Sequence, residues 1–267
     1  MKKQSRHEKP ITVDANGKSI KNPNQITINQ HIIPKKHILG WSNDGKQVTV
    51  NDLASGEIKR LAASNPYFCV MRSWDQWTEN NMLRVNEENY QAQIRLMMDK
   101  QPFTHPEHIT AYYAMLCVRT WVANKERPDY PCEMTELSYE CSKEELEQNE
   151  IEMLDSNVHI ISSTLDNSSQ HMARQVVKLS MNSAFIQFCE ALKGIKWNIF
   201  RSKSKFYHLS DAFYNNYTRK LHILPVFPDC VLIADTTYKS FIKNGLLDVE
   251  YINELLVKEA NKFYITA

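Results

Sequence analysis

One segment of the chain, residues 106–125, is apolar on nearly every side of the helix that its pattern predicts. Apolar and aromatic side chains recur in it at helical spacing, at Ile109, Tyr112, Tyr113, Leu116, Val118 and Trp121. Pro106 fits the first turn of such a helix, where a missing backbone N–H breaks no hydrogen bond. A helix of this kind has to be covered on all sides, so we expect the rest of the chain to fold around it.

The segments around this helix predict an α+β fold, with strands and helices segregated along the chain. Residues 47–50 and 57–61 alternate on either side of a turn and predict an N-terminal β-hairpin. Helices are expected over residues 79–100 and 169–192 and after Asp248, and short strands at 197–201, 206–209, 221–224 and 230–233. The prediction is therefore a β-hairpin, a central helical region, and C-terminal short strands with a final helix.

Domain boundaries follow from the scarcity of linker residues. The chain has 6 glycines and 10 prolines among 267 residues, so long Gly- or Pro-rich linkers are absent. We expect residues 1–28 to be a polar arm or a small ribbon, since Asn16-Gly17 is a hairpin signal. Residues 29–267 are expected to form one compact domain with an acidic excursion at 132–156.

The net charge of +1 excludes a uniformly basic nucleic-acid coat and an acidic tail protein. This near-neutrality hides an uneven distribution, because residues 132–155 carry nine acidic side chains against the single base Lys143, a charge of −8. Residues 133–155 are either a solvated segment or a docking face for a basic protein partner.

A basic cluster interleaved with aromatic residues follows at 193–206. Single-stranded nucleic acid binds such surfaces through charge and stacking, although a strand with inward aromatic and outward basic residues has the same pattern. The residues predicted to contact RNA or DNA are Lys35, Lys36, Lys196, Arg201, Lys203 and Lys205.

The compartment is predicted to be the cytoplasm. No apolar run follows the charged N-terminus as a secretory signal requires, and no apolar stretch is long enough to span a bilayer. The six cysteines form no CxxC pair, which is typical of reduced thiols without a zinc or redox motif.

The densest group of chemically active side chains is Gln30–His37, which places two imidazoles and two ammonium groups within eight residues. Imidazole suits acid–base chemistry and metal ligation near neutral pH. His31–Pro34 is similar to the opening of the metal-binding motif of HNH nucleases, without that motif's downstream Asn and His. Phosphate-binding glycine loops, GxSxG and HExxH are all absent.

Two further charged residues occupy informative positions. Arg119 lies in the apolar helix, so it needs a carboxylate partner, and Glu79, Glu87 and Glu88 of the preceding helix are the candidates. Asp211 closes a predicted strand, where an Asp can belong to a site or form a turn.

The order of several motifs resembles the mainly bacterial family catalogued as domain of unknown function 4238. The matching segments are Asn29–Pro34, Leu39 with Trp41, the hairpin to Leu61, Glu79 with Glu87 or Glu88, Arg119-Thr120, Leu209–Asp211, Ile223–Val226 and Asn253–Ala260. The chain departs from the family at Ile32, where an aromatic residue is usual, and at Ala212-Phe213, where the family continues with Asn-Pro. The resemblance implies that His31, the glutamates, Arg119 and Asp211 converge.

Genes of this family are associated with mobile elements and defence, which favours a nuclease that acts as a bacterial toxin or antiviral, anti-phage effector. If the protein is such a nuclease, we expect His31 to be the general base or a metal ligand, and Glu79, Glu88 and Asp211 to hold a divalent cofactor such as Mg²⁺. Arg119 steadies the phosphate charge. The alternative is a non-enzymatic binding or regulatory protein, in which the same residues form a structural polar network.

Overall fold

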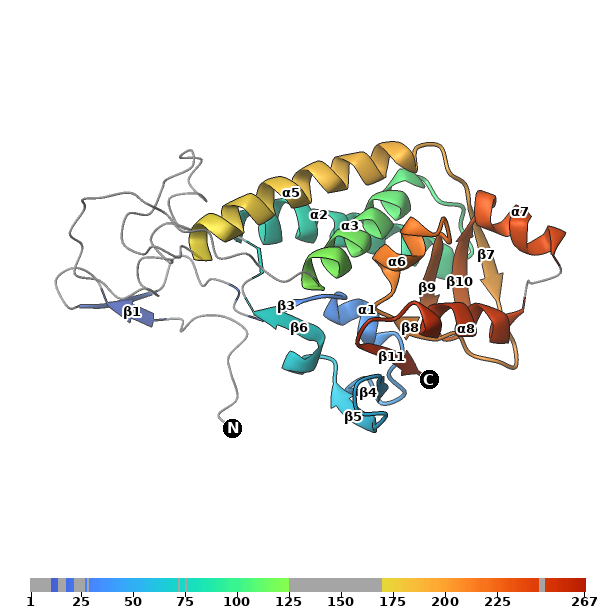
Figure 1. Cartoon of the computed structure of the whole chain (residues 1–267), viewed down its shortest axis with the longest axis horizontal. Helices are drawn as coiled ribbons and strands as arrows, with labels where there is room; N and C mark the ends of the chain where they lie inside the picture. Colours follow the sequence, from blue (N-terminus) through green and yellow to red (C-terminus); the bar gives the residue numbers. More distant parts are fainter. Residues whose placement is uncertain are drawn as a thin grey trace. The chain divides into compact units, whose positions relative to one another are not determined.

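The structure is a computed structural model of the chain, and it describes residues 11–13, 18–21, 27, 29–71, 73–74, 76–124, 170–244 and 248–267 (Figure 1). The chain forms two compact units that are interleaved in sequence. Unit 1 comprises Met1–Gln30, Val70–Val85 and Lys125–Ser183, and unit 2 comprises His31–Cys69, Asn86–Asn124 and Ala184–Ala267. The predicted single domain from residue 29 stays a prediction, and the predicted acidic excursion at 132–156 lies outside the described residues.

The elements confirm an α+β fold with a β-hairpin towards the N-terminus. The strands are β1 Ile11–Val13, β2 Ser19–Lys21, β3 Asn29–His31, β4 Gln47–Asp52, β5 Ile58–Ala62, β6 Cys69–Met71, β7 Trp197–Arg201, β8 Leu209–Ser210, β9 Ile223–Phe227, β10 Cys230–Ala234 and β11 Phe263–Thr266. The helices are α1 Lys35–Leu39, α2 Arg84–Met98, α3 Glu107–Ala123, α5 Gln170–Ala191, α6 Phe213–Thr218, α7 Asp235–Lys243 and α8 Val249–Lys258. A 3₁₀ turn at Pro66–Phe68 and a π-helical turn at Thr78–Leu83 complete the set. No helix in these described ranges combines the length and apolarity needed to cross a lipid bilayer.

Unit 1 contains the antiparallel pair β1–β2, as the Asn16-Gly17 signal predicts. Its polar contacts centre on the side chain of Gln30. The Gln30 amide donates to the Trp74 carbonyl oxygen at 2.8 Å and accepts from the backbone N–H of Ser73 at 2.6 Å. These bonds satisfy backbone groups outside regular secondary structure, which would otherwise be buried without partners.

Unit 2 contains two antiparallel sheets (Figure 1). The four-stranded sheet has the order β5-β4-β11-β8, so the C-terminal strand is internal, with Ile265 opposite both Val50 and Leu209. The three-stranded sheet has the order β7-β10-β9, with β10 in the centre. One core cluster joins Ile223, Val231 and Ile233 of this sheet to Phe241 of α7 and to Ile252 and Leu256 of α8.

Helix α3 is buried on nearly every side, as its apolar pattern predicts. All residues from Tyr112 to Thr120 are buried. Its polar groups are bonded inside the unit: the Trp197 indole N–H donates to Thr110 Oγ1 at 3.0 Å, and the Tyr113 hydroxyl donates to the Leu221 carbonyl oxygen at 3.3 Å. Cys117 points its thiol at the Phe213 carbonyl oxygen of α6. The helix therefore contacts several elements at once.

One predicted element is shorter in the structure. The strand expected at 206–209 is reduced to Leu209–Ser210, because a side chain replaces the partner strand before it. The Asn253 amide of α8 donates to the Phe206 carbonyl oxygen at 2.8 Å and accepts from the His208 backbone N–H at 2.8 Å. Helices α6 and α7 and strand β11 were not predicted, because each is short and lacks a long periodic pattern.

Because β11 is an internal strand, replacing its first residue, Phe263, tests whether the core lies where the structure places it. Phe263 is fully buried, and its ring meets the Phe68 ring edge-on at 5.3 Å. We expect Phe263→Ala to lower the free energy of unfolding by about 3–5 kcal/mol, because it leaves a cavity. Ile58→Ala is the control, since Ile58 is 71% exposed on the edge strand β5, and it should change that free energy by less than about 0.5 kcal/mol. Urea denaturation measures both, and a similar loss for the two variants would contradict the assigned core.

Candidate functional site

The segment Gln30–His37 divides into parts with different environments. His31 ends β3 and is buried, and its Nε2–H donates to the Ala63 carbonyl oxygen at 3.0 Å. Pro34 precedes α1, on which Lys35 and Lys36 are exposed and His37 is buried. The helix therefore presents an ammonium group and an imidazole side by side, one to solvent and one to the interior.

His37 joins three elements of unit 2 through its ring nitrogens. Nε2 lies 2.7 Å from the Pro225 carbonyl oxygen of β9, and Nδ1 lies 2.8 Å from the Tyr112 hydroxyl oxygen of α3. Because a carbonyl oxygen can only accept, Nε2 carries the hydrogen, and the Tyr112 hydroxyl donates to Nδ1. Burial lowers the pKa of His37 to about 4, against the smaller opposing effect of the Pro225 bond, so the ring is neutral at pH 7.

Aromatic rings surround His37. The Tyr90 and Tyr112 rings stack face to face, with centroids 3.7 Å apart and planes inclined by 4°, and the His37 ring lies about 6 Å from each. Stacked rings of this kind resist rotation and hold the imidazole in one orientation. The His37 ring is thus fixed by both its hydrogen bonds and its packing.

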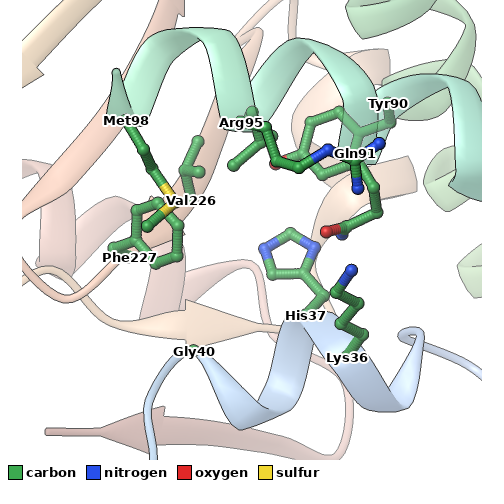
Figure 2. Close-up of a pocket in the computed structure, with 10 residues that line it drawn as sticks. Lys36, His37, Gly40, Tyr90, Gln91, Arg95, Met98, Val226 and Phe227 are labelled. Atoms are coloured by element: carbon green, nitrogen blue, oxygen red, sulfur yellow. The ribbon is translucent and has the colours of Figure 1, made fainter. Parts of the chain in front are cut away.

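A pocket of about 170 Å³ opens beside this ring between α1, α2 and β9. Figure 2 shows Gln91 extending from α2 towards α1, Lys36 and His37 extending from α1 to meet it, and Tyr90 and Arg95 lying alongside α2. The residues that line the pocket are Lys36, His37, Gly40, Tyr90, Gln91, Ile94, Arg95, Met98, Val226 and Phe227. It has apolar walls and two cations, Lys36 and Arg95, both of them exposed.

A bulge in β9 lies opposite Gly40 in the wall of the pocket. Register between β9 and β10 shifts at Cys230/Val231, since Cys230 pairs with Phe227 while Val231 pairs with Pro225. The bulged residue is Val226, which turns towards the pocket. A Cβ atom at Gly40 would lie 3.4 Å from both the Phe227 ring and the Val226 carbonyl oxygen. Gly40 has an ordinary helical φ of −59°, and the tightest contact of such a Cβ would be 3.1 Å, to the His37 carbonyl oxygen of the preceding turn.

Tyr90 lines the pocket, but its hydroxyl is enclosed by the protein and makes no hydrogen bond in the described part of the chain. Leaving a buried hydroxyl unsatisfied costs about 1–3 kcal/mol, so such a group calls for an explanation. Burial also raises the pKa of Tyr90 well above its ordinary value, which keeps the hydroxyl protonated and able to donate.

Arg119 is paired with a carboxylate of the preceding helix, as predicted. Its guanidinium lies 2.7 Å from Glu87 Oε1, with the Arg119 side chain 2% exposed and that of Glu87 30% exposed. The neighbouring Glu88 is exposed on α2. The ion pair therefore neutralises a charge that α3 buries, and it connects α2 to α3.

Asp211 is buried at the turn after β8. Its carboxylate accepts from the backbone N–H of Asn261 at 2.8 Å and from that of Lys262 at 3.0 Å, which fixes the chain as it enters β11. Burial raises the pKa of Asp211 to about 6, and the backbone hydrogen bonds offset only part of this rise. In the described ranges, no hydrogen bond or ion pair joins Asp211 to His31 or Arg119.

Glu79 belongs to unit 1, where its carboxylate accepts from the Trp74 indole N–H at 2.8 Å. Its predicted convergence with Glu88 and Asp211 of unit 2 stays a prediction. Among the residues that the structure describes, no group of three or more His, Cys, Asp or Glu side chains is placed to hold a metal ion.

The predicted nucleic-acid surface around 196–205 is partly neutralised. Arg201 is 2.9 Å from Asp229, and Lys205 is 2.8 Å from Glu250. Lys196 and Lys203 are exposed, and Lys36 is the predicted contact that lines the pocket. The acidic segment 133–155 lies outside the described residues.

Of the ten residues that line the pocket, Lys36 alone was a predicted site residue, and His37 belonged to the group singled out at Gln30–His37. Tyr90 and Met98 lie within the helix expected over residues 79–100, but that expectation does not show which wall they form. Arg95 and Gln91 have the appearance of an ordinary solvated helix face. The spacing of 90, 91, 94, 95 and 98 on one side of α2 is the available signal, and it needs the position of α1 to be interpreted.

A comparison with protein-family models matches residues 29–267 to the family described as "Protein of unknown function (DUF4238)". No curated protein and no solved structure matches the chain.

The buried imidazole predicts a specific dependence of stability on pH. The unfolded His37 ring takes up a proton near pH 6.5 and the folded ring only near pH 4, so stability falls as the pH drops through this range. Between pH 7 and pH 5 the loss due to His37 is about 2 kcal/mol. Asp211 acts in the opposite sense, because its folded pKa is raised.

Wild-type stability should therefore gain about 2 kcal/mol from His37 between pH 5 and pH 7. We expect His37→Gln to lack this gain, so that its free energy of unfolding at pH 7 minus that at pH 5 is smaller than the wild-type difference by this amount. Urea denaturation at the two pH values measures this difference. Asp211→Asn should alter the dependence in the opposite direction. If His37→Gln followed the wild-type pH profile, the ring could not be buried and neutral as described.

Proposed function

The chain belongs to the family of domain of unknown function 4238, and we propose that it binds single-stranded nucleic acid at the pocket between α1, α2 and β9. The observation that carries this proposal is the position of two exposed cations, Lys36 and Arg95, at one aromatic-walled pocket. Positive charge next to a surface on which a base can stack is the combination that single strands require.

The two cations are available to a ligand. In the described part of the chain, neither Lys36 nor Arg95 forms an ion pair with a carboxylate, whereas Arg201 and Lys205 both do. A cation without an internal partner can neutralise a phosphate and release a bound counterion. Arg95 also offers a planar fork of donors that fits two phosphate oxygens.

The interior of the pocket has the size of one planar group. Its volume of about 170 Å³ is close to that of the cavity of about 150 Å³ that holds a benzene ring in another protein. Phe227 and Met98 supply an aromatic ring and a thioether, both of which make favourable contacts with a flat ring. One base of a strand therefore suits the interior, with its phosphates at the two cations.

Cleavage of the bound strand is a second proposal, favoured by one observation. A carboxyl group with a pKa of about 6, as burial gives Asp211, suits acid–base chemistry near neutral pH. In this proposal the protein is a nuclease of the bacterial cytoplasm that uses His31, Arg119, Asp211 and a divalent ion such as Mg²⁺, with Glu79 and Glu88 as ligands. A role as a toxin or anti-phage effector belongs to this same proposal.

Binding is tested by fluorescence anisotropy with a labelled single strand of roughly 12 nucleotides, a length within the range that one binding site covers. We expect the double variant Lys36→Gln/Arg95→Gln to raise Kd about tenfold or more, and to lower the slope of log Kd against log salt concentration by about 1.4, or 0.7 for each lost contact. Lys258→Gln is the control, because Lys258 is an exposed lysine of α8 outside the pocket. Equal binding by the double variant and the wild type would place the interface elsewhere.

Cleavage is tested on the same strand with added Mg²⁺. We expect the wild type to shorten it, and His31→Ala and Glu88→Gln to slow this reaction at least a hundredfold, the scale typical of losing a general base, while their circular dichroism spectra stay unchanged. Full cleavage by both folded variants would remove these residues from the reaction. An intact strand with the wild type would leave binding as the function.

A further inference from the structure

We propose that the bound strand continues from the pocket onto the loop Ser202–Phe206, where Phe206 stacks on a second base and Lys203 neutralises a phosphate. This inference rests on the proposed binding of single strands and adds to it the path of the strand over unit 2. It starts from the basic and aromatic segment 193–206, which supplies no residue to the pocket.

Phe206 presents an aromatic ring to solvent. Its side chain is 56% exposed, and it is the one exposed aromatic residue in the part of the chain that the structure describes. The other described Phe, Tyr and Trp side chains are buried or half-buried. An exposed ring offers a flat face on which a base can stack, whatever the identity of that base.

Hydrogen bonds hold the loop that carries Phe206 at both ends. The Ser202 N–H donates to the Asp229 carbonyl oxygen at 2.9 Å, and the Tyr207 N–H donates to the Pro228 carbonyl oxygen at 2.7 Å. Both acceptors belong to the turn between β9 and β10. A loop that is held before the ligand arrives loses less conformational freedom on binding, so the contact contributes more to affinity.

The loop lies at one end of the pocket. Figure 2 shows Gly40 and Phe227 at the end opposite Gln91. Trp41, which follows Gly40, donates its indole N–H to the Tyr207 carbonyl oxygen at 2.9 Å. The end of α1 that borders the pocket is therefore bonded to the residue that follows the loop.

The distance from Phe206 to the pocket is short. Phe206 precedes Tyr207, whose N–H is bonded to Pro228, and Pro228 follows Phe227 of the pocket wall. Summed along these bonds, the Cα atoms of Phe206 and Phe227 are at most about 12 Å apart. A few nucleotides cover that distance, since stacked bases follow one another at about 3.4 Å. One strand can therefore occupy the pocket and the loop together.

The cations of the segment differ in their availability to a phosphate. Lys203 is exposed and forms no ion pair within the described part of the chain. Lys205 lies 2.8 Å from Glu250. Arg201 lies 2.9 Å from Asp229. We therefore expect Lys203 to release a counterion when a phosphate binds, and the two paired cations to contribute little.

The experiment is fluorescence anisotropy with labelled thymidine strands of roughly 3 and 12 nucleotides. We expect the wild type to bind the longer strand at least tenfold more tightly, because only this strand reaches Phe206 as well as the pocket. Phe206→Leu should weaken binding of the longer strand about tenfold, the scale of one lost base stack, and leave binding of the shorter strand unchanged. Phe206→Tyr keeps a ring and should bind both strands as the wild type does.

Lys203→Gln and Lys205→Gln are a matched pair for the charge. The first should lower the slope of log Kd against log salt concentration by about 0.7 with the longer strand, the value for one phosphate contact on a single strand. The second should leave the slope unchanged, because Glu250 already neutralises Lys205. All of these substitutions are at exposed positions, so the melting temperatures should equal that of the wild type and weaker binding cannot be attributed to unfolding.

The path and the proposed function fail in different ways. Wild-type affinity of Phe206→Leu and Lys203→Gln for the longer strand, with weaker binding by Lys36→Gln/Arg95→Gln, would reject the path and keep the pocket as the interface. Equal weakening by Phe206→Leu and Phe206→Tyr would reject stacking on the ring, and equal slopes for Lys203→Gln and Lys205→Gln would reject the phosphate contact. No binding of either strand by the wild type at low salt would overturn both proposals.

Discussion

The burial of α3 on nearly every side is the constraint on which unit 2 depends. A helix without a solvent-facing stripe has to find partners inside the protein for each of its polar side chains. Thr110 is bonded by Trp197 of β7, Tyr112 by His37 of α1, and Arg119 by Glu87 of α2. Each of these bonds connects α3 to a different element, so the polar groups of α3 determine which strands and helices pack around it.

The pocket is a consequence of this arrangement. Bonding Tyr112 and Pro225 to the same imidazole brings α1 against β9, and the stack of Tyr90 on Tyr112 sets α2 beside them. What remains between the three elements is a space that their larger side chains do not fill. Its walls are fixed by hydrogen bonds and ring stacking, and its cations, Lys36 and Arg95, are exposed. Fixed walls favour selection by shape, and exposed cations favour attraction by charge.

The local patterns predicted much of the fold but less of the site. The all-round apolar character of 106–125 identified α3, and the alternation at 47–50 and 57–61 identified β4 and β5, because both signals are contained within one segment. The density of imidazole and ammonium groups at 30–37 indicated a site in this segment, which does supply Lys36 and His37 to the pocket. Which imidazole lies there could not be predicted, because it depends on a bond between His37 and Pro225, 188 positions apart. Asp211 was placed at a strand end correctly, but its burial depends on the backbone of Asn261 and Lys262, 50 and 51 residues later.

The same long separation has a consequence for how the protein is made. The pocket needs residues near 36, 90 and 226, and the four-stranded sheet of the same unit needs β11, Phe263–Thr266. Contacts so distant in sequence form slowly, because a large loop has to close, at a cost in chain entropy, before the contact can stabilise the fold. During synthesis the first two walls leave the ribosome long before the third, so the unfinished chain exposes the α1 and α2 surfaces without a binding site between them. The proposed binding site is therefore complete only after β9 has been synthesised and has paired with α1.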